Sequence, residues 1–146
     1  MMDIRKIEKE DIDKCVDLCI ESCNRPPWNH KWSYDTALKY LREFADQTRF
    51  VGFILYEHDK ITGILLGHLK TWWANDLLHI DEIFISPDRQ KMGHGKLLLE
   101  HMEQFARDQG CGVVSLMTSQ HMLATEFKND IKYHHAEHYI FLFKTV

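Results

Sequence analysis

Apolar residues in the first third of the chain recur with the spacing of helices. After a short strand predicted over 3–7, the apolar positions of 11–23 repeat every three or four residues, as in an amphipathic helix. This helix should end before Pro26-Pro27, because a residue that precedes proline avoids the helical conformation. Ser33 is a suitable N-cap for a second helix. The apolar residues on the buried side of that helix would be Ala37, Leu38, Leu41, Phe44 and Ala45.

From residue 50 onward the pattern changes to that of strands. Two runs rich in β-branched and aromatic residues, 50–57 and 61–70, flank the polar turn His58-Asp59-Lys60 and predict a β-hairpin. A loop over 72–76 then separates the hairpin from a third strand, predicted over 77–85.

Helices and strands alternate in the rest of the chain. A helix is predicted over 96–109, where Gly110 follows as a C-cap glycine, and a short strand is predicted over 113–118. A last helix over 122–129 precedes a final strand over 139–144. The predicted order is β-α-α-β-β-β-α-β-α-β, which indicates a mixed α/β fold with an antiparallel meander followed by one crossover.

Length, composition and charge narrow the class of protein. The 146 residues suit one core and contain no linker, so we expect a single domain over 1–146. The formal net charge of -4 argues against a nucleic-acid-binding protein, which normally has a basic excess. No apolar run could span a bilayer, no signal peptide is evident, and the four cysteines are not spaced as a disulfide framework. We therefore expect a cytoplasmic protein with no membrane or nucleic-acid partner.

The segment 83–98 has the features of an anion-binding loop. An apolar strand is followed by a loop with Gly93 and Gly95, and then by a Leu-rich helix. Unpaired N–H groups at a helix start, together with the helix dipole, attract a phosphate, and glycines let the backbone approach it closely. The segment also carries three cations, Arg89, Lys91 and Lys96. Neither a Walker A motif nor the G-x-G-x-x-G dinucleotide fingerprint is present.

The pattern Gln90-x-x-Gly93-x-Gly95 resembles the acyl-CoA pyrophosphate loop of the GNAT acetyltransferases, Q/R-x-x-G-x-G/A. The resemblance covers essentially the full chain, and its specific part is residues 77–118. It implies the GNAT fold, a mixed and mostly antiparallel sheet of six or seven strands flanked by about four helices. It also implies acetyl-CoA as co-substrate, with no metal.

The same resemblance implies where the donor binds. The loop backbone would hold the CoA pyrophosphate, and the preceding strand would pair with the pantetheine arm as if it were another strand. A backbone N–H near Ile83 would stabilise the oxyanion that forms at the thioester. The implied donor-binding residues are Ile83, Phe84, Ile85, Gln90, Lys91, Met92, Gly93, His94, Gly95 and Lys96.

Acyl transfer to an ammonium requires a base, because the amine must first lose a proton. Asp81 and Glu82 are the candidates, and strict strand alternation would let at most one of them face a given pocket. The run from His79 to Ile83 resembles some aminoglycoside N-acetyltransferases, which have an Asp at the Asp81 position. We therefore favour Asp81 slightly and keep Glu82. For each carboxylate, an ion pair at the sheet surface is the alternative role.

The family's usual general acid is missing from this sequence. Many members carry N-x-x-A-x-x-F-Y in the last helix, and its Tyr protonates the departing thiolate. Here Ala124 and Phe127 match, whereas His121 replaces the Asn and Lys128 replaces the Tyr. Protonation by that Tyr therefore cannot be carried over.

Four tryptophans lie in the two loops that border the acceptor pocket of GNAT proteins. Aromatic walls beside carboxylates suit a cationic amine, through cation–π attraction, although packing at a core edge or a dimer interface is an equal alternative. His79 would share the face of Asp81. The predicted substrate-binding residues are Trp28, Trp32, Trp72, Trp73 and His79.

These features predict an N-acetyltransferase that moves the acetyl group of acetyl-CoA to a primary amine of a small molecule, such as an aminoglycoside or a polyamine, by direct transfer. One alternative is a CoA-binding or regulatory module that has lost turnover. Another is an acetyltransferase for protein or peptide N-termini. The expected partner is a small-molecule amine acceptor, and a homodimer is left open.

Overall fold

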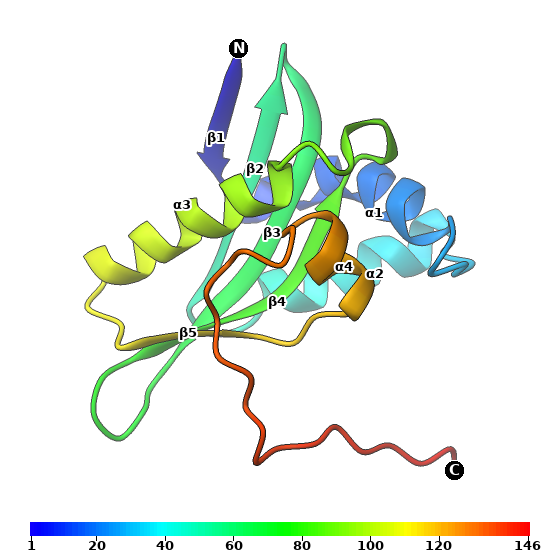
Figure 1. The fold of residues 1–146 in the computed structure, drawn as a ribbon. Coiled ribbons are helices and arrows are strands. Elements are labelled where there is room, and N and C mark those ends of the chain that lie inside the picture. Colours follow the sequence, from blue (N-terminus) through cyan, green and yellow to red (C-terminus); the bar gives the residue numbers. More distant parts are fainter.

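A five-stranded sheet in the order β1-β2-β3-β4-β5 forms the centre of the computed structural model, which describes residues 1–146 (Figure 1). The strands are β1 (Met2–Lys6), β2 (Phe50–Glu57), β3 (Lys60–Lys70), β4 (Leu77–Ile85) and β5 (Val113–Leu116). The first four are antiparallel neighbours, and β5 pairs with β4 in parallel after a helical crossover. This is the predicted meander followed by one crossover.

The helices begin and end near the predicted positions. They are the 3-10 helices η1 (Lys9–Cys15) and η2 (Pro87–Arg89) and the α-helices α1 (Val16–Cys23), α2 (Tyr34–Ala45), α3 (His94–Asp108) and α4 (Gln120–Thr125). Ser33 caps α2 as predicted, and its hydroxyl accepts a hydrogen bond from the backbone N–H of Thr36. In the hairpin turn, His58 and Asp59 both have positive φ, as a two-residue turn between twisted strands requires.

Both faces of the sheet are buried. Figure 1 shows α3 and α4 in front of the sheet and α1 and α2 behind it. A hydrophobic core lies on each face of the sheet, and alternate residues of the central strands point into one core or the other. Ile54 packs with α1 and α2, whereas Leu55 packs with α3. Burial on both faces explains why β2 and β3 read as continuous apolar runs. None of the helices combines the length and apolar character needed to cross a membrane.

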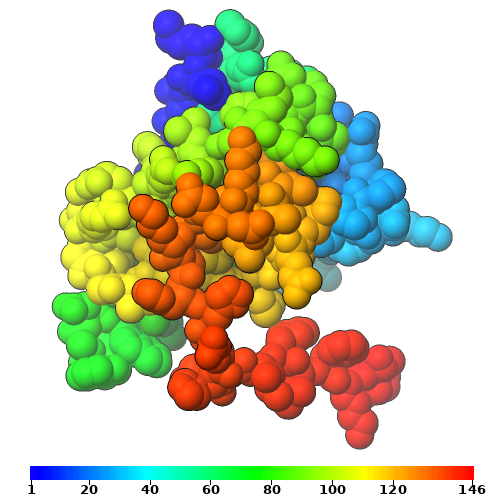
Figure 2. Space-filling view, viewed as in Figure 1, coloured from blue at the N-terminus to red at the C-terminus, as the bar shows by residue number.

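The prediction of a final strand over 139–144, and with it of six or seven strands, is wrong. Residues 126–146 contain no helix or strand, and the tail leads away from the body of the molecule (Figures 1 and 2). The side chains of Tyr139 to Phe143 are 71–83% exposed. Apolar and aromatic residues favour a strand only where a neighbouring strand supplies hydrogen bonds and side-chain contacts, and the tail lies along no strand.

Candidate active site

The candidate site lies where β4 and β5 separate. Their ladder ends at the pair Ile80–Leu116, and β4 continues to Ile85 without a partner on that edge. A cavity of about 410 Å³ opens at this point. One wall consists of β4 from Ile80 to Ile85, together with Gln90. The opposite walls are formed by Ser22, Cys23, Trp28, His30, Trp32, Tyr40, Leu116, Met117, Thr118, Ser119, His121, Met122, Thr125 and Glu126.

A β-bulge brings both candidate bases to this cavity. Across β3 and β4, Leu66 is paired with Glu82 and Gly67 with Ile80, so Asp81 is one extra residue in β4. Asp81 and Glu82 both line the cavity, and the expectation that at most one could do so is therefore wrong. The bulge also requires a glycine at position 67, because a Cβ atom there would lie 2.7 Å from the carbonyl oxygen of His79.

Glu82 is held by a hydrogen bond from the hydroxyl of Tyr40, which reaches across from α2. Burial raises the pKa of Glu82 above its ordinary value, and the Tyr40 hydrogen bond partly opposes the rise. Burial and the nearby carboxylate also raise the pKa of Tyr40, so that its hydroxyl stays a donor. The Tyr40 ring lies 4.8 Å from the rings of both Trp32 and Phe44, which fixes its position.

Asp81 lies in a different hydrogen-bonded group. His68 Nδ1 donates to Asp81 Oδ2 at 2.8 Å, and Gln47 Nε2 is 3.5 Å from the same oxygen. The His68 ring also contacts the ring of His79, at 5.8 Å between centroids. His79 hydrogen-bonds to Ser115 and does not line the cavity.

The structure brings two of the four predicted tryptophans to the site. Trp28 lies edge-on to the ring of His121, at 5.9 Å, and Trp32 packs on Tyr40. Both line the cavity. Trp72 and Trp73 are 56% and 87% exposed and lie outside the cavity wall.

Of the predicted donor-binding residues, Ile83, Phe84, Ile85 and Gln90 line the cavity. Lys91, Met92 and Gly93 form the turn that leads into α3, and His94, Gly95 and Lys96 begin the helix. Gly93 is the N-cap of α3 with a φ of 84°, a left-handed conformation that suits glycine. The backbone N–H groups of the first turn of a helix have no partner within the helix, so the start of α3 presents donors for an anion.

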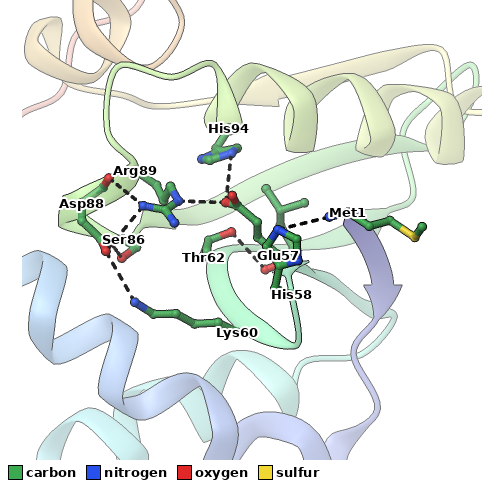
Figure 3. Close-up of polar contacts among 10 residues, drawn as sticks. Met1, Glu57, His58, Lys60, Thr62, Ser86, Asp88, Arg89 and His94 are labelled. Carbon is green, nitrogen blue, oxygen red and sulfur yellow. Dashed lines mark hydrogen bonds and ion pairs between the residues drawn. The ribbon is translucent and has the colours of Figure 1, made fainter.

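Two of the three cations near the loop are already paired. Arg89 Nε donates to Glu57 Oε2 at 2.8 Å, and Figure 3 shows the Arg89 side chain between Glu57 and Asp88, with His94 on the other side of Glu57. Lys96 Nζ donates to Asp130 at 3.1 Å. The loop therefore offers an anion mainly backbone N–H groups.

Five ionisable residues of the cavity wall were not predicted as site residues: Cys23, His30, Tyr40, His121 and Glu126. Tyr40 precedes Glu82 by 42 residues, and no spacing rule connects positions that far apart. Glu126 is buried beside Phe127, and its hydrogen bond to the backbone of Lys91 spans 35 residues, so no local pattern indicates its position.

Several solved structures resemble this chain in fold. A crystal structure of an aminoglycoside acetyltransferase from an uncultured soil metagenomic sample, in complex with sisomicin, has a TM-score of 0.76 at 19% identity, covering 99% of this chain and 96% of that one. The aminoglycoside N-acetyltransferase AAC(6')-Iy in complex with CoA has a TM-score of 0.74 at 19% identity, covering 100% and 96%.

A third similar structure is a ribosomal-protein-alanine N-acetyltransferase from Brucella melitensis, with a TM-score of 0.76 at 12% identity and 100% of both chains covered. Identities this low show a shared fold. None of the curated proteins matches the sequence. Residues 14–127 match the family model described as Acetyltransferase (GNAT) family, and the chain therefore belongs to the GNAT family of acetyltransferases.

Proposed function

We propose that the protein transfers the acetyl group of acetyl-CoA directly to a primary amine of a small cationic molecule. The observation that carries the proposal is the cavity at the separation of β4 and β5. Asp81 and Glu82 line it on β4, and Gln90, which begins the loop that leads into α3, lines it as well. Holding two reactants in one cleft supplies much of the acceleration that such a transfer needs.

The chain's own residues fit the donor in two ways. The edge of β4 beyond Ile80 has no partner strand, so the backbone groups between Ile83 and Ile85 that point away from β3 are free to hydrogen-bond to the amide groups of a pantetheine arm. The N–H groups from Gln90 to Lys96 surround the positive end of α3, where a pyrophosphate is stabilised. Acetyl-CoA supplies the acetyl group as an activated thioester.

Glu82 is the proposed base, although the sequence slightly favoured Asp81. Its raised pKa makes it a better proton acceptor than an ordinary carboxylate, and Tyr40 holds it toward the cavity. Glu82 takes one proton from the ammonium, and the neutral amine attacks the thioester carbon to form the new C–N bond. The C–S bond breaks, and the second proton that the nitrogen loses passes to water. The thiolate takes its proton from water, since Lys128, at the usual Tyr position, is exposed. Asp81, paired with His68, adds negative potential near the amine.

The cavity walls favour a cationic acceptor. Trp28 and Trp32 present aromatic surfaces close to the two carboxylates of β4, and an amine cation is attracted by both kinds of group. An aminoglycoside or a polyamine has several such amines. The crystal structure solved with sisomicin supports an acceptor of this class, because that protein has the same fold.

A CoA-binding module without turnover is the second candidate. The observation that favours it is the loss of the usual Asn and Tyr, whose places are taken by His121 and Lys128. In that case the protein would bind CoA through the same loop and release no thiol from acetyl-CoA with any amine.

The test measures release of the CoA thiol from acetyl-CoA with a panel of aminoglycosides, polyamines and N-terminal peptides, and with no acceptor as background. We expect release with a cationic small molecule, and a loss of about a hundredfold or more in Glu82→Gln. Glu43→Gln, which makes the same change at an exposed position on α2, should keep full activity. Equal activity in Glu82→Gln would contradict the base assignment. If none of the amines causes thiol release, the protein is instead a CoA-binding module without turnover.

A further inference from the structure

The cavity contains a buried carboxylate that the proposed reaction does not use. Glu126 follows α4 directly and is only 2% exposed. Its Oε1 atom accepts a hydrogen bond from the backbone N–H of Lys91, at 3.0 Å, and its Oε2 atom is buried without any partner. Leaving a buried charged oxygen without a partner is costly, so this arrangement calls for an explanation.

Glu126 lies against the start of α3 as well as against the loop. A Cβ atom added to Gly95, in the first turn of α3, would lie 2.9 Å from the Cβ atom of Glu126. The first turn of α3 contains no acidic residue of its own, and the side chain of Glu126 packs against it. The positive end of a helix dipole stabilises a negative charge at the helix N-terminus.

No lysine or arginine side chain forms an ion pair with Glu126. Burial raises the pKa of its carboxyl, and the Lys91 hydrogen bond and the charges of His94, His121 and Lys128 oppose this rise. The nearby Arg89 and Lys96 are paired with Glu57 and Asp130. The His94 ring is also buried, and its Nδ1 atom has no partner, while its Nε2 atom lies 3.9 Å from Glu57. The carboxylate is therefore held by one backbone N–H and the helix dipole, which are the groups that hold a phosphate in a loop of this type.

We propose that the carboxylate of Glu126 occupies, in the free protein, the place of a phosphate group on the loop from Gln90 to Lys96, and that it must leave before the CoA pyrophosphate binds. This inference rests on the proposed function, because it takes CoA to bind at that loop. The carboxylate and the pyrophosphate compete for the N–H of Lys91 and would repel each other if both stayed. Glu126 thus lowers the affinity of the donor site.

The test is calorimetric titration of the intact protein and its variants with CoA. Glu126→Gln removes the charge and keeps an oxygen that can accept from Lys91, whereas Glu126→Ala removes the side chain. We expect both variants to bind CoA at least about tenfold more tightly than the native protein, a difference of about 1.4 kcal/mol. Glu137→Gln, the same change at an exposed position of the C-terminal segment, should bind as the native protein does.

Pantetheine serves as a second probe, because it has the arm of CoA and no phosphate. Its affinity should be the same in all four proteins, which would locate the effect at the pyrophosphate. If Glu126 only anchors the loop, Glu126→Gln will bind CoA as the native protein does and Glu126→Ala will bind it more weakly; that pattern would overturn the inference and leave the proposed function standing. Absence of CoA binding in every protein would overturn both.

Discussion

At the scale of single residues, the proposed chemistry depends on how the protein raises the pKa of one carboxylate. Burial raises the pKa of Glu82, and the Tyr40 hydroxyl lowers it again by donating a hydrogen bond to the charged form. A base acts in its ionised form, so the rate should rise with pH through the pKa of Glu82 in the folded protein and then level off. The two opposing effects therefore set the lower pH limit of activity.

Tyr40→Phe tests this balance. The phenyl ring keeps the contacts with Trp32 and Phe44 and removes the hydrogen bond that favours ionised Glu82. A hydrogen bond to a charged group contributes about 1.5–3 kcal/mol. We expect the acidic inflection of the kcat profile to move upward by about one pH unit, since one unit is about 1.4 kcal/mol. The measurement is kcat against pH from 5 to 9, with thiol release as the signal.

Tyr34→Phe is the matched control, because Tyr34 lies at the start of the same helix with half of its surface exposed. Its pH profile should coincide with that of the native protein. A Tyr40→Phe profile that is lower at every pH with an unmoved inflection would mean that Tyr40 supports the fold or the acceptor and does not tune the base.

The sequence identified part of this residue set. Asp81, Glu82 and Gln90 were predicted from their neighbours in the chain, and all three line the cavity. Tyr40 and Glu126 were not predicted, because their roles depend on contacts with segments far away in the sequence. Local patterns contain no information on which helix residue will face which strand.

At the scale of elements, the separation of β4 from β5 and the bulge in β4 create the site. The hairpin and β4 were predicted almost to the residue, because hydrophobic runs bounded by polar turns define strands well. The bulge was not predicted, because it is a property of the register between β3 and β4. The prediction of a strand over 139–144 was wrong for a related reason. Five consecutive apolar residues favour a strand, but a strand forms only where another strand pairs with it.

Gly67→Ala should damage the bulge directly. The new methyl group would lie 2.7 Å from the carbonyl oxygen of His79, a backbone atom that cannot move without shifting β4. We expect a loss of about 1–3 kcal/mol in the free energy of unfolding, as for other overpacked sites, together with a larger loss of acetyl transfer because Asp81 and Glu82 are displaced. Denaturant unfolding and thiol release measure the two effects.

Gly63→Ala is the comparison on the same strand. A methyl group there would meet the end of the Leu98 side chain at 2.8 Å, and a side-chain end can rotate away. In Gly63→Ala, the loss of acetyl transfer should be no larger than the loss of folded protein accounts for. If Gly67→Ala is destabilised and yet retains native kcat in its folded fraction, then the bulge does not position the catalytic carboxylates.

At the scale of the whole molecule, charge is distributed unevenly over a protein with a formal net charge of -4. The cavity end has the carboxylates of Asp81 and Glu82, while the loop at the start of α3 offers N–H groups and a positive dipole end. Under the proposed function, a cationic acceptor would be attracted to the carboxylates of β4, and the donor pyrophosphate to the start of α3 once Glu126 has left it. The proposed direct transfer, which has no covalent acyl-enzyme, requires both reactants to bind in this cleft at the same time.

Such attraction should be visible as salt dependence. Between about 0.01 M and 0.15 M salt the Debye length falls from about 30 Å to about 8 Å, which screens the field of the cavity beyond its mouth. We expect the KM of a polyamine to rise a few-fold over this range with little change in kcat. Screening weakens the attraction that brings the cation into the cavity more than it slows the chemical step. An aromatic amine, which is neutral at pH 7, should show a much smaller rise.

Asp81→Asn separates the field of the cavity from general effects of salt. This variant removes one charge beside the proposed base while keeping a side chain of the same shape next to His68. The salt dependence of the polyamine KM should become shallower, and the KM of the neutral amine should stay unchanged. If salt raises both KM values equally in the native protein, then the carboxylates do not select for charge, and the aromatic walls of Trp28 and Trp32 would have to account for acceptor choice.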